Sequence, residues 1–545
     1  MKIAPLGGLG EIGLNAMVFE HEGRRLLVDC GLMFPRGDVP GVEVVMPDLG
    51  WLFEQPDLLD GVVLTHAHED HVGALPALLR RVKVPVYGTK FTLGVARHRL
   101  EEVGLGNTEL RPIGPRSPET IGAFTVEPLR MTHSIPDAIG LAIGAGGITA
   151  VHTGDFKLDL EPIDGQLTDL ERLGELGERG VDLLLSDSTN AEVPGVTRSE
   201  RVVEATFMRL FPQAPGRIIV SVFGSHLHRV QHTLTTAEKL GRKVLVWGRS
   251  LERNVRIARD LGYLKVNDDT LVDLQGFLAL PREKALLICT GAQGEPRSAL
   301  VTMVSDEPRE LRVLAGDTVI LSSRTIPGNE PLVTDLIDRA YARGATVIWP
   351  ALEPGVHVSG HGARDEQKKL IQVARPKMFV PIHGELHHLH HHIGLAREAG
   401  LEPHQARLAT DGDLLELDEQ GLTTLGRIPV GRLFGRRESD AYVSGRAIDE
   451  RRNLGHGVVF AAVALEAGSG RVVAGPRLTS RGLPSDEDAL LPLAAQAARA
   501  NLLELSEILR GDDALVVEQV TAGIRRVFKQ AAGRRPTVVV QVLRV

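Results

Sequence analysis

Three histidines and two carboxylates occur within six residues of this chain, in the segment THAHEDH at residues 65–71. The apolar residues 61–64 come directly before it, which predicts a strand that delivers the polar side chains to a loop. Imidazole and carboxylate groups are ligands for zinc and related divalent ions, and histidines on alternate residues of an extended loop can point to the same side. The HxHxDH spacing therefore predicts a metal site, with an Asp and a His left over for a second ion.

Three further candidate ligands, His133, Asp155 and His383, lie at or near the ends of apolar segments that predict strands. An isolated His or Asp beside glycine at a strand end is more often a turn residue than a ligand. The combination of all three with the HxHxDH segment favours ligands.

The order HxHxDH, His, Asp, His resembles that of the metallo-β-lactamase superfamily. The opening residues 5–13 and the apolar residues 26–31 fit the same superfamily. The resemblance implies that Asp29 supports the histidine loop and that Asp70 also orients the nucleophile. The implied ligands are His66, His68 and His133 for one metal ion, Asp70, His71 and His383 for the second, and Asp155 as the bridge.

Two divalent ions suit the hydrolysis of a phosphate ester. At a separation of about 3.5–4 Å, they can share and deprotonate a water while they neutralise the charge of the displaced phosphate. We expect zinc first, with manganese or magnesium as alternatives, because His and Asp ligands serve several of these ions.

The middle of the chain narrows this diverse superfamily. More than 200 residues separate Asp155 from His383, and they alternate between predicted strands and helices, which predicts an inserted domain. The segments LSDSTN at 185–190 and HVSGH at 357–361 resemble the first and second motifs of the β-CASP nucleases, with His383 as the third.

Three more segments, at residues 221–229, 290–296 and 322–330, resemble the ribonuclease J family within the β-CASP group. This resemblance runs from residue 1 to about residue 430 and continues more weakly to the C-terminus. Two positions depart from it: Leu14 stands where a basic residue is expected, and Arg324 where a small one is usual. Neither is a predicted ligand, so we expect activity to be kept while local contacts with RNA differ.

The resemblance implies 5′-to-3′ exonuclease action on 5′-monophosphorylated single-stranded RNA, with release of nucleoside 5′-monophosphates, together with endonuclease action in mRNA decay and rRNA maturation. Three alternatives stay open: a catalytically weak scaffold subunit of an RNA-decay complex, a β-CASP DNA nuclease and a small-molecule hydrolase. Retention of every expected ligand argues against the scaffold, whereas nothing local separates RNA from DNA.

Two catalytic roles and one binding pocket follow from the resemblance. His361 is the predicted general acid, and Asp187 would keep it protonated and oriented. A pocket that grips the terminal 5′ phosphate is predicted from Ser225, His228, His357, Ser359 and Gly360.

The net charge of −8 and the pI near 6.2 are not those of a protein that coats nucleic acid unspecifically. Binding to RNA must then be local, and we expect contributions from a few basic residues, Arg80, Arg81, Lys83, Arg97, Arg99 and Arg229. With only 4% aromatic residues, extensive base stacking and strong sequence specificity are not expected.

The predicted fold class is α/β, a metallo-β-lactamase αββα sandwich with an inserted α/β β-CASP domain and a small C-terminal α/β domain. We expect sandwich segments at 1–195 and 356–430, the β-CASP domain at 196–355, a linker at 431–455 and a C-terminal domain at 456–545. In the last domain, residues 457–465, 470–479 and 536–545 predict strands, and 486–509 and 514–531 predict helices.

The C-terminal domain favours a homodimer, with a tetramer and RNA-decay partner proteins as further possibilities. Two cysteines in apolar runs indicate a reducing compartment, and we find no leader or membrane-spanning pattern, so the predicted location is the cytoplasm. The histidine-rich residues 387–392 predict a helix with mixed faces rather than a second structured metal site.

Overall fold

The computed structural model describes residues 1–35, 39, 41–305, 310–437, 441–455, 457–484 and 487–545. These residues form two compact units, a larger one made mostly of residues 1–433 and a smaller one made mostly of residues 441–545. Each unit has its own hydrophobic core. None of the helices within the described residues is long and apolar enough to cross a membrane.

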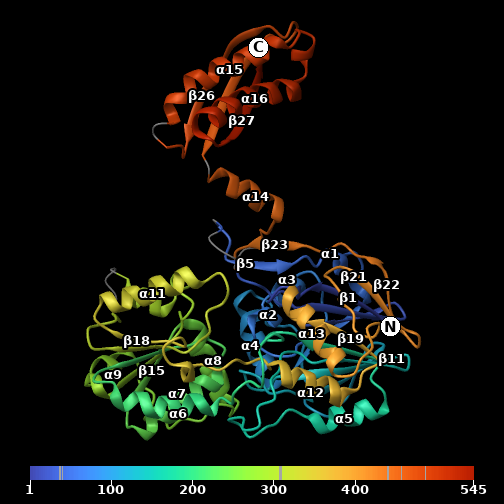
Figure 1. The fold of residues 1–545 in the computed structure, drawn as a ribbon, viewed down its shortest axis with the longest axis vertical. Helices are drawn as coiled ribbons and strands as arrows, with labels where there is room; N and C mark the ends of the chain where they lie inside the picture. Colours follow the sequence, from blue (N-terminus) through green and yellow to red (C-terminus); the bar gives the residue numbers. More distant parts are fainter. Residues whose placement is uncertain (36–38, 40, 306–309, 438–440, 456, 485–486) are drawn as a thin grey trace. The chain divides into compact units, whose positions relative to one another are not determined.

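Two facing β-sheets form the centre of the larger unit (Figure 1). The eight-stranded sheet has the order β22 (Gly421–Arg427), β21 (Asp413–Asp418), β1 (Lys2–Gly7), β3 (Ala16–His21), β4 (Arg24–Val28), β6 (Leu59–Val63), β7 (Val86–Gly88) and β8 (Leu110–Pro112). The six-stranded sheet has the order β19 (Met378–Ile382), β13 (Leu183–Asp187), β12 (Ile148–His152), β11 (Ile139–Ala145), β10 (Phe124–Arg130) and β9 (Glu119–Ile121).

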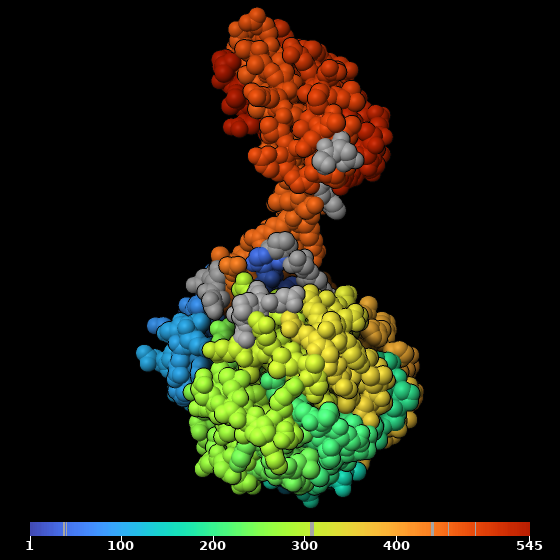
Figure 2. Space-filling model, turned by 90° about the vertical axis from the view of Figure 1, so that its left-hand side faces the viewer, coloured from blue at the N-terminus to red at the C-terminus, as the bar shows by residue number. Residues whose placement is uncertain are grey.

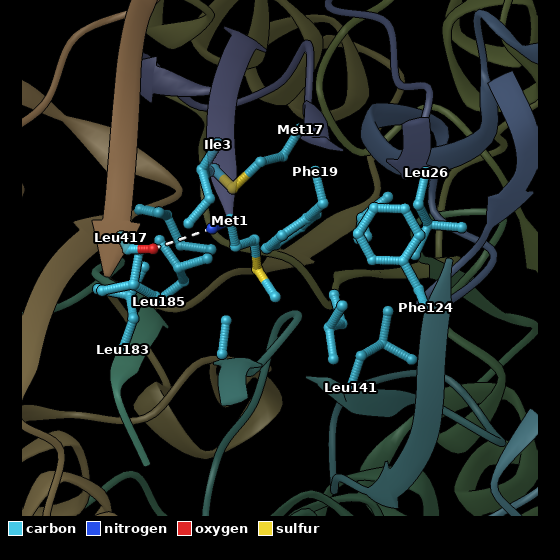
Figure 3. Packing of buried hydrophobic residues seen from close by; sticks show 14 of the residues in the cluster. Met1, Ile3, Met17, Phe19, Leu26, Phe124, Leu141, Leu183, Leu185 and Leu417 are labelled. Carbon is cyan, nitrogen blue, oxygen red and sulfur yellow. Dashed lines mark hydrogen bonds between the residues drawn. The ribbon is translucent and has the colours of Figure 1, made fainter. Parts of the chain in front are cut away.

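Apolar side chains from both sheets meet in one buried cluster (Figure 3). Phe19 and Leu26 of the first sheet lie in this cluster with Phe124 and Leu141 of the second, and each is at most 1% exposed. Full burial of such a side chain stabilises the fold by about 1.5–3 kcal/mol, so the cluster is the main force that holds the sheets together. The amino group of Met1 also donates a hydrogen bond to the Leu417 carbonyl, at 2.9 Å.

Helices complete the sandwich. Those of the larger unit outside the insertion are α1 (Gly50–Glu54), α2 (Glu69–Val72), α3 (Leu75–Leu79), α4 (Lys90–Glu102), α5 (Leu170–Arg179), α12 (Arg364–Ala374) and α13 (Leu386–Glu398). On the six-stranded sheet, Leu173 of α5, Leu370 of α12 and Ile393 of α13 pack against Leu184 and Phe379. The short strands outside the two main sheets are β2 (Leu9–Gly10), β5 (Val44–Pro47) and β20 (Gly384–Glu385).

An insertion separates two neighbouring strands of the six-stranded sheet. Strands β13 and β19 pair in parallel, with Asp187 opposite Ile382, although the whole insertion lies between them in sequence. The insertion contains a parallel five-stranded sheet of order β15 (Lys243–Trp247), β16 (Ala285–Cys289), β14 (Ile218–Ser221), β17 (Thr318–Leu321) and β18 (Thr346–Ile348). Its residues, green to yellow in Figure 2, fill most of the visible face of the larger unit.

Helices cover both faces of the inserted sheet, as a parallel sheet requires. They are α6 (Arg201–Leu210), α7 (Leu227–Lys239), α8 (Arg249–Asp260), α9 (Leu274–Leu278), α10 (Ala299–Val304) and α11 (Glu330–Ala342). Val203, Val230 and Val255 belong to the cluster on one face, and Leu300 and Leu336 belong to the cluster on the other. The predicted sandwich with an inserted α/β domain is confirmed.

The smaller unit is a three-stranded sheet with two helices packed on one face. Its sheet has the order β26 (Val472–Arg481), β25 (Val458–Leu465) and β27 (Thr537–Arg544), covered by α15 (Leu491–Glu504) and α16 (Asp513–Ala532). All three predicted strands and both predicted helices are present, with α15 shorter than expected. The region predicted as a linker also contains β23 (Arg432–Gly435), β24 (Val443–Ser444) and a helix, α14 (Gly445–Leu454).

Candidate metal centre and nuclease site

The HxHxDH loop is folded around one buried carboxylate, that of Asp29. The backbone amide and the hydroxyl of Thr65 both donate to Asp29, each at 2.8 Å. His71 Nδ1 lies 2.7 Å from Asp29 Oδ2. Asp29 itself has a φ of 60°, a left-handed conformation that costs energy and clusters at functional sites. It therefore occupies the supporting position predicted for it.

The backbone of the same loop is held by Asn15, a residue that the sequence analysis missed. The side-chain amide of Asn15 donates to the Asp70 carbonyl at 3.0 Å, and its backbone amide donates to the same oxygen at 3.1 Å. Gly31 packs against the same carbonyl, and only glycine fits there, because a Cβ atom would lie 1.6 Å from the Asp70 carbonyl oxygen. The side chains of Asp70 and His71 are thus fixed from the backbone outward.

The first group of predicted ligands comes together at one point. His66 Nε2 and His133 Nε2 lie 3.0 Å and 3.2 Å from His68 Nδ1. Asp155 Oδ2 lies 3.6 Å from His66 Nε2 and 3.8 Å from His133 Nε2. Burial lowers the pKa of His68 to about 4 and holds those of His66 and His133 well below the usual value. Neutral imidazoles with converging nitrogen atoms are the form that binds a cation.

The second group shares Asp155 with the first. His71 Nε2 lies 3.3 Å from Asp155 Oδ1, and His383 Nε2 lies 3.3 Å from Asp70 Oδ2. Burial disfavours the charged imidazoles, but the surrounding carboxylates, Asp155 foremost, outweigh it and raise the pKa of His71 and His383 well above the usual value. All seven predicted ligands therefore belong to two adjoining groups, each compact enough to hold an ion.

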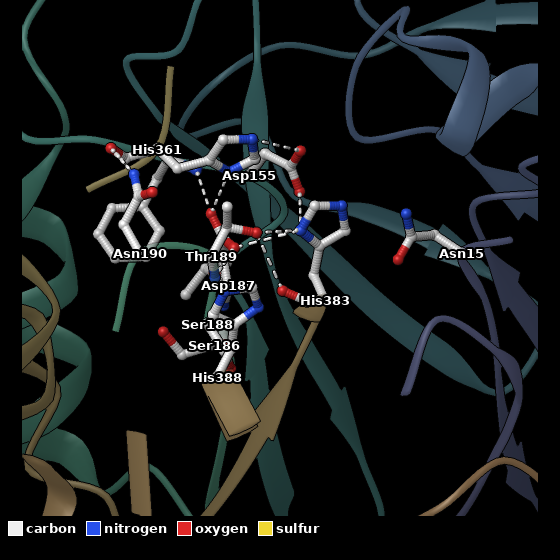
Figure 4. A network of polar contacts seen from close by, with 12 residues as sticks. Asn15, Asp155, Ser186, Asp187, Ser188, Thr189, Asn190, His361, His383 and His388 are labelled. Atoms are coloured by element: carbon white, nitrogen blue, oxygen red, sulfur yellow. Dashed lines mark hydrogen bonds and ion pairs between the residues drawn. The ribbon is translucent and has the colours of Figure 1, made fainter. Parts of the chain in front are cut away.

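The register of the six-stranded sheet brings Asp187 and His383 to the same edge. His383 directly follows Ile382, which pairs with Asp187, and His383 Nδ1 lies 3.2 Å from Asp187 Oδ1 (Figure 4). His361 Nδ1 lies 2.8 Å from the other oxygen of Asp187, and its Nε2 lies 3.9 Å from Asp155 Oδ2. Although burial opposes it, the charge of Asp187 raises the pKa of His361. The charge of His361 in turn helps to lower the pKa of Asp187 against the effect of burial.

The predicted phosphate pocket is built around the loop that carries His361. The Gly360 carbonyl lies 2.7 Å from Nδ1 of the candidate ligand His133, and His228 Nδ1 lies 3.1 Å from the His133 carbonyl. Ser359 Oγ accepts hydrogen bonds from Asn190 Nδ2 at 2.9 Å and from the His361 amide at 3.1 Å. Gly360 and His228 are therefore joined through His133, and Ser359 is joined to the loop after β13.

The other two predicted pocket residues lie in the neighbouring turns. His357 Nδ1 is 3.4 Å from the Arg229 guanidinium. Ser225 stands in the turn before α7, and its carbonyl accepts a hydrogen bond from the Leu227 amide at 2.9 Å. The hydrogen bonds of the described residues give the Ser225 hydroxyl no partner in the pocket. Asn190, which has a φ of 68°, ends the LSDSTN motif and was not predicted to have a role of its own.

The expectation that Arg229 contacts RNA is wrong. Its side chain is fully buried and lies 3.0 Å from Glu200, with further hydrogen bonds to the carbonyls of Ser322 and Val356. Arg99 is also buried and pairs with Glu69 of the HxHxDH segment. Of the six basic residues expected to contribute to RNA binding, the other four are exposed: Arg80, Arg81, Lys83 and Arg97.

The histidine-rich segment forms α13, as predicted, with His388 and His392 buried and the other histidines exposed. Glu192, His387 and His388 approach one another closely enough to suggest another ion site. However, His388 Nδ1 accepts a hydrogen bond from the Glu385 amide at 3.1 Å, so its proton lies on Nε2, which faces Glu192 at 3.4 Å. This is a hydrogen bond at the start of a helix rather than a set of free ligand atoms.

Comparison with known proteins gives matches along most of the chain. The family models that match are "Metallo-beta-lactamase superfamily" at 9–190, "Ribonuclease J, beta-CASP domain" at 215–340, "Zn-dependent metallo-hydrolase RNA specificity domain" at 351–406 and "Ribonuclease J C-terminal domain" at 446–545.

Full-length relatives give the same result. Ribonuclease J of Mycolicibacterium smegmatis is 40% identical over 550 residues, which cover 100% of this chain and 97% of that protein. Ribonuclease J of Thermus thermophilus is 38% identical and covers 100% of this chain and 95% of its own. A solved structure of a protein of unknown function from Enterococcus faecalis has a TM-score of 0.51 at 16% identity, with 78% of this chain and 99% of that one covered, which supports the fold alone.

Proposed function

The chain belongs to the ribonuclease J family, and from that premise we propose that this metal-dependent ribonuclease removes nucleotides from the 5′ end of 5′-monophosphorylated single-stranded RNA and also cuts internally. The observation that carries the proposal is the position of the 357–361 loop. Its Gly360 carbonyl orients His133, while its His361 faces Asp155 with Asp187 behind it. One short loop therefore carries both residues proposed to bind the terminal 5′ phosphate and the proposed general acid.

The residues of the centre fit divalent metal ions. Asp155 Oδ1 is buried, and no residue in the described part of the chain donates a hydrogen bond to it. A buried carboxylate oxygen without a donor costs free energy unless a cation satisfies it. We propose zinc as the resident ion, with manganese or magnesium as alternatives, and His66, His68, His133, Asp70, His71, His383 and Asp155 as its ligands. When bound, two such ions would activate water and neutralise charge on the scissile phosphate.

His361 is the proposed general acid. Because Asp187 holds Nδ1 at 2.8 Å, the proton on Nε2 points into the centre, where Asp155 Oδ2 lies 3.9 Å away. In the proposed hydrolysis, a water oxygen bonds to phosphorus, the bond from phosphorus to the 3′ oxygen breaks, and His361 gives its proton to that departing oxygen. Asp70 would help to orient the attacking water.

The pocket sets the length of the released product. If Ser359, His357, His228, Gly360 and Ser225 bind the terminal phosphate, the next phosphodiester along the strand is the one presented to the metal centre. Each cycle then releases one nucleoside 5′-monophosphate. Cleavage within the strand would occur when RNA enters without a seated 5′ end. The cellular roles we propose are mRNA decay and rRNA maturation in the cytoplasm.

We further propose that the smaller unit joins two copies of the chain. Phe460 of β25 pairs with Val539 of β27, so both side chains lie on the same face of the sheet, and they are 44% and 46% exposed. The helices cover the opposite face. An apolar sheet face of this kind is typical of an interface. Light scattering should give a dimer mass for the native chain and a monomer mass for Phe460→Asp.

One cleavage experiment tests the proposed activity. Metal-loaded protein is incubated with 5′-labelled RNA that carries a 5′ monophosphate, with its 5′-triphosphate twin and with a DNA version. Early release of labelled mononucleotide from the monophosphate RNA alone supports the proposal. Internal fragments only would limit the enzyme to endonuclease action, preferred cleavage of the DNA would make it a DNA nuclease, and no cleavage with any metal would contradict the proposed activity.

A further inference from the structure

Arg324 lies beside the predicted phosphate pocket although the family resemblance predicts a small residue there. It follows strand β17, and Gln293 fixes the backbone around it. Gln293 Nε2 donates to the Arg324 carbonyl at 2.9 Å, and the Ile326 amide donates to Gln293 Oε1 at 2.7 Å. Gln293 is 1% exposed, so the turn that presents Arg324 is tied to the interior of the inserted domain.

The Arg324 side chain reaches across to the loop that follows Asp187. Its NH1 group donates to Asn190 Oδ1 at 3.0 Å. Asn190 Nδ2 donates on to Ser359 Oγ at 2.9 Å and to the His361 carbonyl at 3.2 Å. Two successive hydrogen bonds therefore connect the guanidinium to the serine hydroxyl that we place in the phosphate pocket.

The positive charge of Arg324 is not neutralised by a neighbouring carboxylate. Among the residues that the structure describes, no Asp or Glu forms an ion pair with it, and the side chain is exposed. A guanidinium stays protonated at any physiological pH and has five N–H donors, of which Asn190 takes one. The others are free to meet an anion from solution. Phosphate is the anion that this planar, multidentate group recognises best.

We propose that Arg324 is a specificity-determining residue that binds the terminal 5′ phosphate of the RNA together with Ser359. This inference rests on the proposed exonuclease function and adds to it a permanent charge in the pocket. Ser359 and Gly360 give directional contacts to the phosphate, whereas Arg324 gives a charge that acts on the whole anion. Its hydrogen bond to Asn190 holds the guanidinium at the edge of the pocket rather than in open solvent.

The test measures binding without cleavage. The full-length protein is treated with chelator, and its affinity for a short 3′-labelled RNA is measured by fluorescence anisotropy, once with a 5′ phosphate and once with a 5′ hydroxyl. Loss of one charge-assisted contact should weaken binding of the 5′-phosphate RNA by about 10-fold in Arg324→Gln. Binding of the 5′-hydroxyl RNA should change less than about 2-fold.

Three variants separate charge from structure. Arg324→Gln keeps a donor for Asn190 but removes the charge, and Arg324→Lys should restore most of the phosphate preference. Arg339→Ala removes an exposed arginine from α11 of the same inserted domain and should leave the preference unchanged. Equal weakening of both RNAs in Arg324→Gln, or no weakening of either, would overturn the assignment.

Cleavage assays with the metal-loaded, full-length protein separate a failure of the exonuclease proposal from a failure of the role assigned to Arg324. Absence of mononucleotide release by the native enzyme would count against the exonuclease function. The ratio of the two dissociation constants still decides the role of Arg324, because it is measured without turnover.

Discussion

Two buried clusters of charged side chains lie in the larger unit, and they are balanced in opposite ways. In the metal centre, Asp70, Asp155 and Asp187 face histidines, and within the described residues no Lys or Arg forms an ion pair with them. The second cluster, here called the matched cluster, consists of Lys157, Asp159, Glu200 and Arg229 and contains two positive and two negative charges.

The matched cluster is neutral without help from solution. Lys157 lies 3.3 Å from Asp159 and 3.8 Å from Glu200, and Arg229 lies 3.0 Å from Glu200. Despite burial, the charge of Arg229 holds the pKa of Glu200 well below its usual value. In the metal centre, by contrast, the three carboxylates are balanced only by histidines, which can give up their protons when a cation binds. Buried acids and histidines therefore form a ligand site or a structural bridge according to whether the chain itself supplies the matching cation.

The largest expected effect comes from Asp155→Asn, which removes the carboxylate shared by both ligand groups. We expect activity to fall by at least about 1000-fold, because the bridge and the charge for both ions are lost together. Metal content per chain, measured by mass spectrometry of the metal, should fall in parallel. His391→Ala, which removes an exposed histidine of α13, is the control. Full metal content in Asp155→Asn would contradict the view that the carboxylates of this centre are there to bind cations.

His361→Ala tests whether the centre separates metal binding from proton transfer. Loss of a positioned general acid typically lowers the rate by about 100- to 10,000-fold. Because His361 is not among the proposed metal ligands, metal content should stay unchanged. The measurement is the rate of cleavage of an internally labelled RNA at saturating substrate, alongside metal analysis. A variant that loses metal together with activity would make His361 a ligand instead.

Arg229→Met tests the matched cluster. Removal of one partner from a buried ion pair leaves the other charge uncompensated and typically costs about 3–5 kcal/mol of stability. We therefore expect a lower midpoint of thermal unfolding, with metal content per folded chain unchanged. Arg339→Met breaks an exposed pair with Asp335, which is worth no more than about 1 kcal/mol, and should leave the midpoint close to native. Parallel metal loss in Arg229→Met would mean that the two clusters act as one.

The same contrast explains what the sequence could predict. Four of the seven predicted ligands, His66, His68, Asp70 and His71, lie within six consecutive residues, and a strand before them sets their direction, so their grouping follows from local pattern alone. His133, Asp155 and His383 could be added because each lies just beyond the end of a strand and the family order is known. In the matched cluster, by contrast, Arg229 and Glu200 meet only through the packing of the inserted domain, and the sequence led us to expect that Arg229 binds RNA instead.

Backbone groups were out of reach for another reason. The Gly360 carbonyl that orients His133 leaves no trace in residue type, and Asn15 holds the histidine loop mainly through the Asp70 carbonyl, with its side-chain amide 3.2 Å from His71 Nε2. In the smaller unit, the predicted helix at 486–509 is shortened because α15 begins at Leu491, next to Pro492, which favours the first turn of a helix. Residues 485 and 486 lie outside the described residues.

Ser359→Ala has the smallest expected effect and tests the region between the two clusters. The Ser359 hydroxyl accepts a hydrogen bond from Asn190, which lies in the loop after Asp187 of the metal centre. Two residues before Ser359, His357 contacts Arg229 of the matched cluster. Loss of one hydroxyl contact to the terminal phosphate should raise KM for mononucleotide release by about 10-fold and leave internal cleavage nearly unchanged, because internal cleavage does not use that phosphate. Ser225→Ala, which removes a hydroxyl from the turn before α7, is the matched variant. If Ser359→Ala slows both reactions equally through kcat, the serine supports the position of His361 rather than the binding of phosphate.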